Sequence, residues 1–138
     1  MGYRSRITNF KAEPLPVKPG VSEEKVLSAL NAVDPEYGDQ IRFFFDLDSD
    51  IEEDGEFYME PSGEGGKGYD LIEALEALVA ILRTLAHGPQ ETRGFRFRFE
   101  IIGEEGDHRL VQSDGVELTV TPGVVTYPGA PDWPVETP

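Results

Sequence analysis

The chain has 138 residues with 12 Lys and Arg against 27 Asp and Glu, a formal net charge of −15 at pH 7 and a pI near 4.3. This length fits one domain with its own hydrophobic core, and the lack of cysteine excludes disulfides, thiolate zinc sites and a cysteine nucleophile. The negative charge disfavours direct binding to nucleic acid or to an anionic membrane, and it favours a basic protein surface as partner.

A strand and a short helix are expected first along the chain. Residues 3–10 alternate in polarity as a strand does, and several prolines between Pro14 and Gly20 then break regular structure. Ser22 is a suitable helix N-cap, and apolar residues at helical spacing follow it until Pro35.

Residues 41–51 are expected to form the first strand of an acidic β-hairpin. Apolar and polar side chains alternate there with the two-residue period of a strand, and Asp54 with Gly55 supplies a hairpin turn. The apolar side chains assigned to the buried face are Phe43, Phe45, Leu47, Ile51, Phe57 and Met59.

Residues 71–85 carry the strongest helical pattern. Leucines recur with a period near 3.6 residues, Asp70 and Glu73 match a capping box, and Gly88 with the following proline ends the helix. A strand over 94–102 follows with its phenylalanines inward and Arg96 and Arg98 outward, and strands over 109–112 and 117–121 complete the pattern.

The predicted fold class is α+β, with a largely antiparallel sheet and two helices packed on one face. Its order, β-α-β-β-α-β, is ferredoxin-like and is followed by a C-terminal β-hairpin. We expect residues 1–127 to form a single domain and residues 128–138 to form a Pro-rich extended or disordered tail. Because the chain lacks a signal-peptide pattern and a long apolar run, we also expect a soluble, cytoplasmic protein.

The acidic residues are concentrated in one segment, which is the leading candidate site. Residues 46–76 hold twelve acids and one base, Lys67, so a net charge of −11 lies there. Like charges crowded on a hairpin cost stability unless a cationic partner or salt neutralises them. The candidate partner-binding residues, on one exposed face of the expected hairpin, are Asp46, Asp48, Asp50, Glu56 and Glu60.

The leading hypothesis is therefore a non-enzymatic protein that docks a basic protein surface, as an inhibitor or decoy would. Keeping a sheet edge soluble is the alternative use of the same charges. A third reading is an accessory structural protein whose Pro-rich tail contacts a neighbouring subunit through Trp133.

A glycine-rich segment provides a different alternative. Residues 63–68 match G-x-G-x-x-G ahead of a helix, where free N–H groups bind anions. Glu64 places a negative charge in that segment, and no parallel βαβ unit surrounds it. The candidate residues for nucleotide or phosphate binding are Gly65, Gly66, Lys67, Gly68 and Tyr69.

Metal binding and catalysis are not predicted, and no cofactor is expected. The acids from Asp50 to Asp54 imitate the start of an EF-hand loop, but Pro61 stands where that loop needs a bidentate carboxylate. The chain has no G-x-S-x-G motif, and His87 and His108 lie in helix-end and turn contexts.

Three short stretches resemble a family of small acidic proteins of actinobacteria and their phages, whose function is unknown. They are Met1-Gly2-Tyr3-Arg4-Ser5-Arg6-Ile7-Thr8, Lys67-Gly68-Tyr69-Asp70, and Gly103-Glu104-Glu105-Gly106-Asp107-His108-Arg109-Leu110. The chain departs from the family at His108, where an aromatic residue is more usual, and in its very acidic residues 46–56. The resemblance implies a one-domain protein of phage or mobile-element origin and supplies no catalytic residue.

Overall fold

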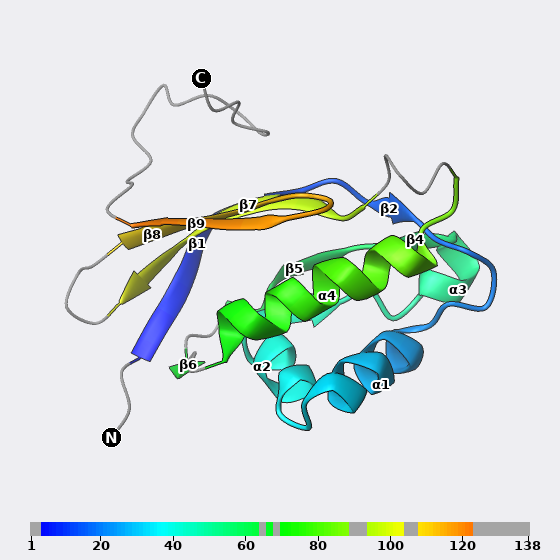
Figure 1. The fold of residues 1–138 in the computed structure, drawn as a ribbon, viewed down its shortest axis with the longest axis horizontal. Coiled ribbons are helices and arrows are strands. Elements are labelled where there is room, and N and C mark those ends of the chain that lie inside the picture. The colour runs from blue at the N-terminus through cyan, green and yellow to red at the C-terminus, as the bar shows by residue number, and fades with distance from the viewer. Residues whose placement is uncertain (1–3, 64–65, 68–69, 89–93, 104–107, 123–138) are drawn as a thin grey trace.

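The computed structural model describes residues 4–63, 66–67, 70–88, 94–103 and 108–122 (Figure 1). Its helices are α1 (Glu23–Val33), α2 (Tyr37–Phe44), α3 (Ile51–Asp54) and α4 (Leu71–Leu85). Its strands are β1 (Arg4–Ala12), β2 (Leu15–Pro16), β3 (Phe45–Leu47), β4 (Glu56–Phe57), β5 (Met59–Pro61), β6 (Gly66–Lys67), β7 (Arg96–Gly103), β8 (His108–Asp114) and β9 (Leu118–Pro122). All strand pairs are antiparallel, which confirms the predicted α+β class with a largely antiparallel sheet.

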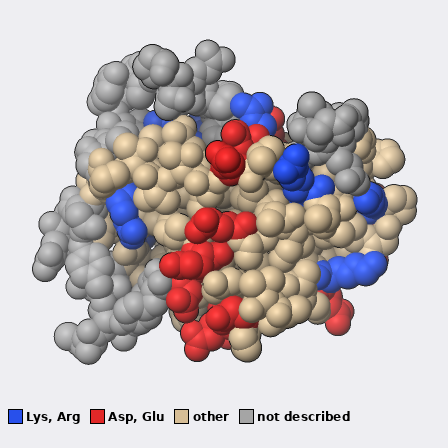
Figure 2. All heavy atoms as spheres, viewed as in Figure 1, with Lys and Arg blue, Asp and Glu red and all other residues tan. Residues whose placement is uncertain are grey.

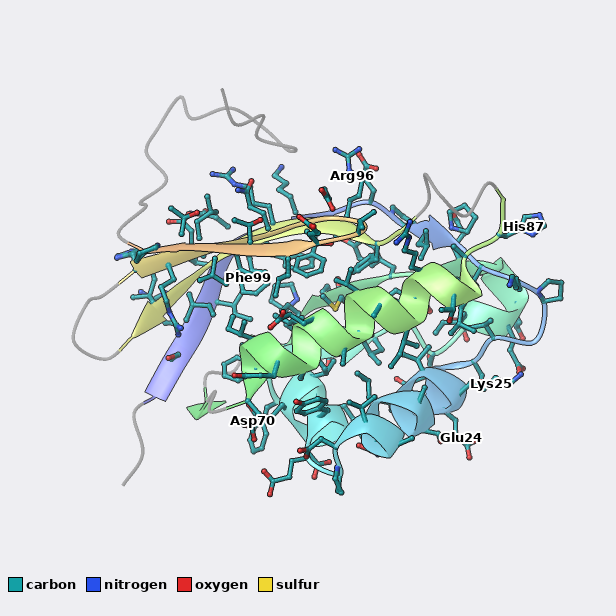
Figure 3. All side chains as sticks on the ribbon, in the orientation of Figure 1. Glu24, Lys25, Asp70, His87, Arg96 and Phe99 are labelled. Carbon is teal, nitrogen blue, oxygen red and sulfur yellow. The ribbon has the colours of Figure 1, made fainter. Side chains whose placement is uncertain are left out.

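The main sheet has five strands in the order β6-β1-β7-β8-β9. In Figure 1, α4 runs along one face of this sheet, and α1 and α2 lie beyond α4. The inward side chains of β7 are fully buried, as the alternation of residues 94–102 predicts, and Figure 3 shows Arg96 and Phe99 on opposite sides of the sheet. The apolar face of α4 is also buried, since Leu75, Leu78 and Leu82 are 0 % exposed.

A bulge in β1 brings the main sheet into contact with β3. The register with β7 shifts between Thr8 and Lys11, and Asn9 takes a positive φ of 53° within the shift. Its side-chain amide donates to the carboxylate of Glu100 at 2.6 Å. The bulge turns Phe10 inward, where its ring lies 5.5 Å from the ring of Phe45.

Residues 37–61 differ from the predicted hairpin. Helix α2 occupies Tyr37–Phe44, so Ile41 and Phe44 are buried at helical spacing, whereas Phe43 is 54 % exposed instead of inward. The next segment is divided into β3, α3 and β4, and Gly55, predicted in a hairpin turn, caps α3 at a φ of 69°. The predicted strand over 41–51 is therefore confirmed only for Phe45–Leu47, which pair with the returning strand β5. It is wrong for residues 41–44, where a helical period competes with the two-residue alternation.

The ferredoxin-like order is not confirmed. Strand β3 pairs with β5 in a separate two-stranded sheet, and β2 pairs with β4 in another. Strand β1 pairs with β7 in the main sheet, and β8 with β9 forms an antiparallel pair at the end of the described chain. Within the described ranges, no helix combines the length and apolar character needed to cross a bilayer. The predicted tail, residues 128–138, lies outside the described residues.

Candidate functional site

The five predicted partner-binding residues belong to several short elements and the turns between them instead of one continuous hairpin. Asp46 and Glu60 lie directly opposite each other in the β3–β5 pair, and both are exposed. Asp50 is the N-cap residue of α3, and Glu56 lies in β4 opposite Pro16. Asp46 and Glu60 therefore lie on one face of paired strands as predicted, while α3 interrupts the alternation between them.

Carboxylates still lie close together around α3. The Oδ1 atom of Asp48 accepts the Asp50 N–H at 2.8 Å, which holds the start of α3 in place. Desolvation and then the negative charge of Asp48 raise the pKa of Asp54, with further contributions from Asp50 and Glu53. We call residues 46–60, which contain these carboxylates, the acidic segment.

The glycine-rich segment proposed for nucleotide or phosphate binding is only partly among the described residues. Gly66 and Lys67 form β6, the edge strand that pairs with β1, instead of an open loop leading into a helix. The backbone of Gly66 is packed so that an added Cβ would lie 3.4 Å from the ring of Phe43. Gly65, Gly68 and Tyr69 lie outside the described residues, and nothing in the described part favours a phosphate there.

A second group of acids lies where the first half of α4 meets the ends of α1 and α2. Desolvation raises the pKa of the Tyr37 phenol, and the negative charges of four surrounding acids raise it further. In Figure 2, acidic side chains form a strip over the N-terminal half of α4 and the neighbouring part of α2, and basic side chains lie toward the edges of this view. We call this group the α4 acidic strip; its members are Asp34, Glu73, Asp70 and Glu76.

The strip is not explained by helix capping alone. Asp70 occupies the N-cap position of α4, but its side chain makes no cap hydrogen bond; the predicted capping box is therefore wrong in its geometry. Its backbone N–H instead lies 3.4 Å from the side-chain oxygen of Gln40 in α2. Glu73 and Glu76 are both exposed.

At one end of the strip, an open pocket of about 330 Å³ lies between α4 and the start of β9. Two carboxylates and three aliphatic side chains line it: Glu76, Val79, Val116, Glu117 and Leu118. Val79 is buried, whereas Val116 is 47 % exposed and presents an unusually large apolar surface for a turn residue. We call this feature the α4/β9 pocket.

The turn between β8 and β9, which forms one wall of the pocket, is held by hydrogen bonds of Ser113 and Asp114. The buried Ser113 hydroxyl donates to the carbonyl of Phe95 at 2.8 Å and accepts the N–H of Gly115 at 3.1 Å. Asp114 accepts the N–H groups of Val116 and Glu117, each at 2.8 Å, and these bonds lower the pKa of Asp114. The turn is therefore fixed before any ligand arrives.

A close approach of two glycines locks the same turn. An added Cβ at Gly94 would overlap the carbonyl oxygen of Gly115, and Gly115 itself has a φ of 97°. Neither position accepts another residue without a backbone shift. The close approach fixes Gly115, the residue directly before Val116 and Glu117, against Gly94, two residues before the start of β7.

The exposed carboxylates of these regions can accept hydrogen bonds from a cationic group. Across the described residues, no group of three or more His, Asp and Glu side chains is placed to hold a metal ion. None of the acids of the acidic segment, the strip or the pocket forms an ion pair with a described residue. Sequence reasoning missed Glu117 and treated Glu76 as part of a helix start; the one available signal was the apolar Val116 in a polar turn.

Comparisons with protein-family models, with curated proteins and with solved structures found no match. The resemblance to small acidic proteins of actinobacteria and their phages therefore stays a prediction.

Proposed function

We propose that this chain is a non-enzymatic acidic protein that docks a basic protein surface. Its exposed carboxylates are set beside other carboxylates instead of beside bases, both in the acidic segment and along the α4 acidic strip. A partner that brings Lys or Arg to these positions would gain electrostatic attraction and relieve the repulsion between the acids.

The observation that carries the proposal is the grouping of exposed carboxylates in the acidic segment, around α3 and on the β3–β5 pair. Around α3, desolvation and then the carboxylates of Asp48, Asp50 and Glu53 raise the pKa of Asp54, as expected where acids lie near acids. Asp46 opposite Glu60 repeats the arrangement on the β3–β5 pair. Like charges directly opposite on paired strands are destabilising, which is the cost that a cationic partner would offset.

An inhibitor or decoy is the form of this function that the charges favour. A surface that binds nucleic acid is basic, and a net charge of −15 directs a small protein toward such a surface. The proposed protein would then compete with nucleic acid for its partner without contacting nucleic acid itself.

The test is capture of a basic protein from host lysate at two salt concentrations. Between about 0.1 M and about 1 M salt, the screening length falls from about 10 Å to about 3 Å, so docking through exposed charges should be lost. We expect the wild type to retain a basic protein at the lower concentration and to release it at the higher one. The variant Asp46→Asn/Asp48→Asn/Asp50→Asn should retain less of the same protein at low salt.

A direct readout is available in the folded protein. A basic partner that docks over the α4 acidic strip should lower the raised pKa of Tyr37, because a nearby cation favours the phenolate. Retention that is equal at both salt concentrations, together with an unchanged Tyr37 titration in the bound state, would contradict the proposed function.

A further inference from the structure

The α4/β9 pocket combines an apolar surface with two carboxylates from distant parts of the chain. Glu76 comes from α4, and Glu117 comes from the turn between β8 and β9. Val79, Val116 and Leu118 supply the aliphatic part of its lining. Its volume of about 330 Å³ is at the lower end of the range for sites that hold small groups.

An arginine side chain fits this combination better than the other cationic groups of proteins. Its aliphatic stem packs on apolar side chains while its charged end stays at a polar rim. Its planar guanidinium has five N–H donors and binds carboxylates with two parallel hydrogen bonds. A lysine ammonium is a compact and strongly hydrated point charge, and it matches an apolar lining less well.

The carboxylates of the pocket are available for such a ligand. Neither Glu76 nor Glu117 forms an ion pair with a described residue. The wall that carries Glu117 is fixed by the hydrogen bonds of Ser113 and Asp114, so little ordering is required when a ligand binds. Half-exposed Val116 would also lose contact with water.

We propose that the α4/β9 pocket binds one arginine side chain of the basic protein that this chain docks. The proposal rests on the proposed function and adds a specific anchor to it. Arginines in pockets are frequent among the few residues that carry most of an interface's binding energy. The α4 acidic strip, of which Glu76 is a member, would then guide the rest of the basic surface into place.

The test is an NMR titration of the intact chain with three tripeptides blocked at both ends: Gly-Arg-Gly, Gly-Lys-Gly and Gly-citrulline-Gly. Citrulline keeps the shape of arginine and lacks its charge. We expect saturable shifts of the amides of Val79, Val116 and Leu118 with the arginine peptide, at millimolar affinity. The lysine peptide should bind about tenfold more weakly, and the citrulline peptide should produce no saturable shift.

Two charge-matched variants complete the design. Glu76→Gln/Glu117→Gln should abolish the saturable shifts while leaving the remaining amide signals in place, which shows that the variant is folded. Glu23→Gln/Glu24→Gln removes the same charge from the first turn of α1, on which Figure 3 shows Glu24, and should bind the arginine peptide as the wild type does. Equal binding of the arginine and citrulline peptides, or unchanged shifts in the pocket variant, would overturn the proposal.

The experiments can reject the arginine site and the proposed function separately. A basic protein that binds in a salt-dependent way to wild type and to Glu76→Gln/Glu117→Gln with equal affinity would remove the arginine site alone. Absence of binding by the arginine peptide and by any basic protein at low salt would remove both proposals.

Discussion

The acidic segment and the α4/β9 pocket both present carboxylates to solvent, and they differ in what surrounds those groups. In the acidic segment, Asp46 lies opposite Glu60, and desolvation and then Asp48 raise the pKa of Asp54, so acids mainly lie near other acids. In the pocket, Glu76 and Glu117 border aliphatic side chains on a turn that is fixed by hydrogen bonds. The first arrangement attracts a basic protein over a distance. The second provides a pocket into which only a side chain of suitable shape fits.

This difference separates two contributions to binding. Exposed charges raise the rate of encounter and lose their effect in salt, whereas a formed pocket mainly affects how long a partner stays bound. The following substitutions disturb one region and leave the other in place, in order of expected effect.

Gly94→Ala should produce the largest effect and should act on the pocket. The new Cβ overlaps the Gly115 carbonyl oxygen, and a backbone neighbour cannot rotate away. We expect the free energy of unfolding to fall by about 4 kcal/mol in urea denaturation. Gly20→Ala is the control, because its φ is 86° with nothing within 4 Å of an added Cβ. It should cost about 1 kcal/mol, and an equal cost for both would show that the contact between the two glycines is unimportant.

Ser113→Ala should have the next largest effect. Its buried hydroxyl serves both the Phe95 carbonyl and the Gly115 N–H, and alanine leaves both groups unsatisfied. We expect a loss of about 2 kcal/mol in the free energy of unfolding. Arginine-peptide affinity should fall as well, while the Asp54 titration measured by NMR stays unchanged. A shifted Asp54 titration would mean that the two regions are coupled.

Asp114→Ala should cost about 1 kcal/mol at neutral pH, because Val116 and Glu117 lose their shared acceptor. The folded-state pKa of Asp114 is lowered from 3.8, so its ionised carboxylate stabilises the fold above that value. This stabilisation is lost as the pH falls through the lowered folded-state pKa. The difference in stability between wild type and variant should therefore shrink below pH 3.8, and a difference that stays constant would contradict the assignment.

Asp54→Asn should have the smallest effect and the opposite sign. The folded-state pKa of Asp54 is raised above 3.8, so its ionised form destabilises the fold at neutral pH. That destabilisation disappears as the pH falls through the raised pKa toward 3.8. The variant should have a slightly higher denaturation midpoint than the wild type at neutral pH and the same midpoint in acid. A lower midpoint at neutral pH would show that Asp54 is satisfied by the fold.

The parts of the fold that the sequence predicts correctly are those with one dominant period. The leucines of α4 follow a helical period alone, and Phe95, Phe97 and Phe99 follow a strand period alone; all of these phenylalanines are buried. Residues 41–51 carry both periods, since Ile41 and Phe44 are spaced for a helix while Phe45 and Leu47 are spaced for a strand. Tertiary packing decides between them, and it places a helix before the strand.

The pocket was beyond sequence reasoning for a different reason. Glu76 and Glu117 meet only because α4 crosses the inner face of the sheet near β9, and that arrangement depends on the order of the strands. Local charge density drew attention to the acidic segment, where α3 separates the residues that alternation would have aligned.

The most direct test compares two variants that each remove two negative charges, one from each region. Affinity for the captured basic protein should be measured at about 0.1 M salt with wild type, Glu76→Gln/Glu117→Gln and Asp46→Asn/Glu60→Gln. We predict that the pocket variant weakens binding by about tenfold or more, while the acidic-segment variant weakens it about threefold or less. Equal weakening by both variants would contradict the claim that the position of the carboxylates, rather than their number, determines binding.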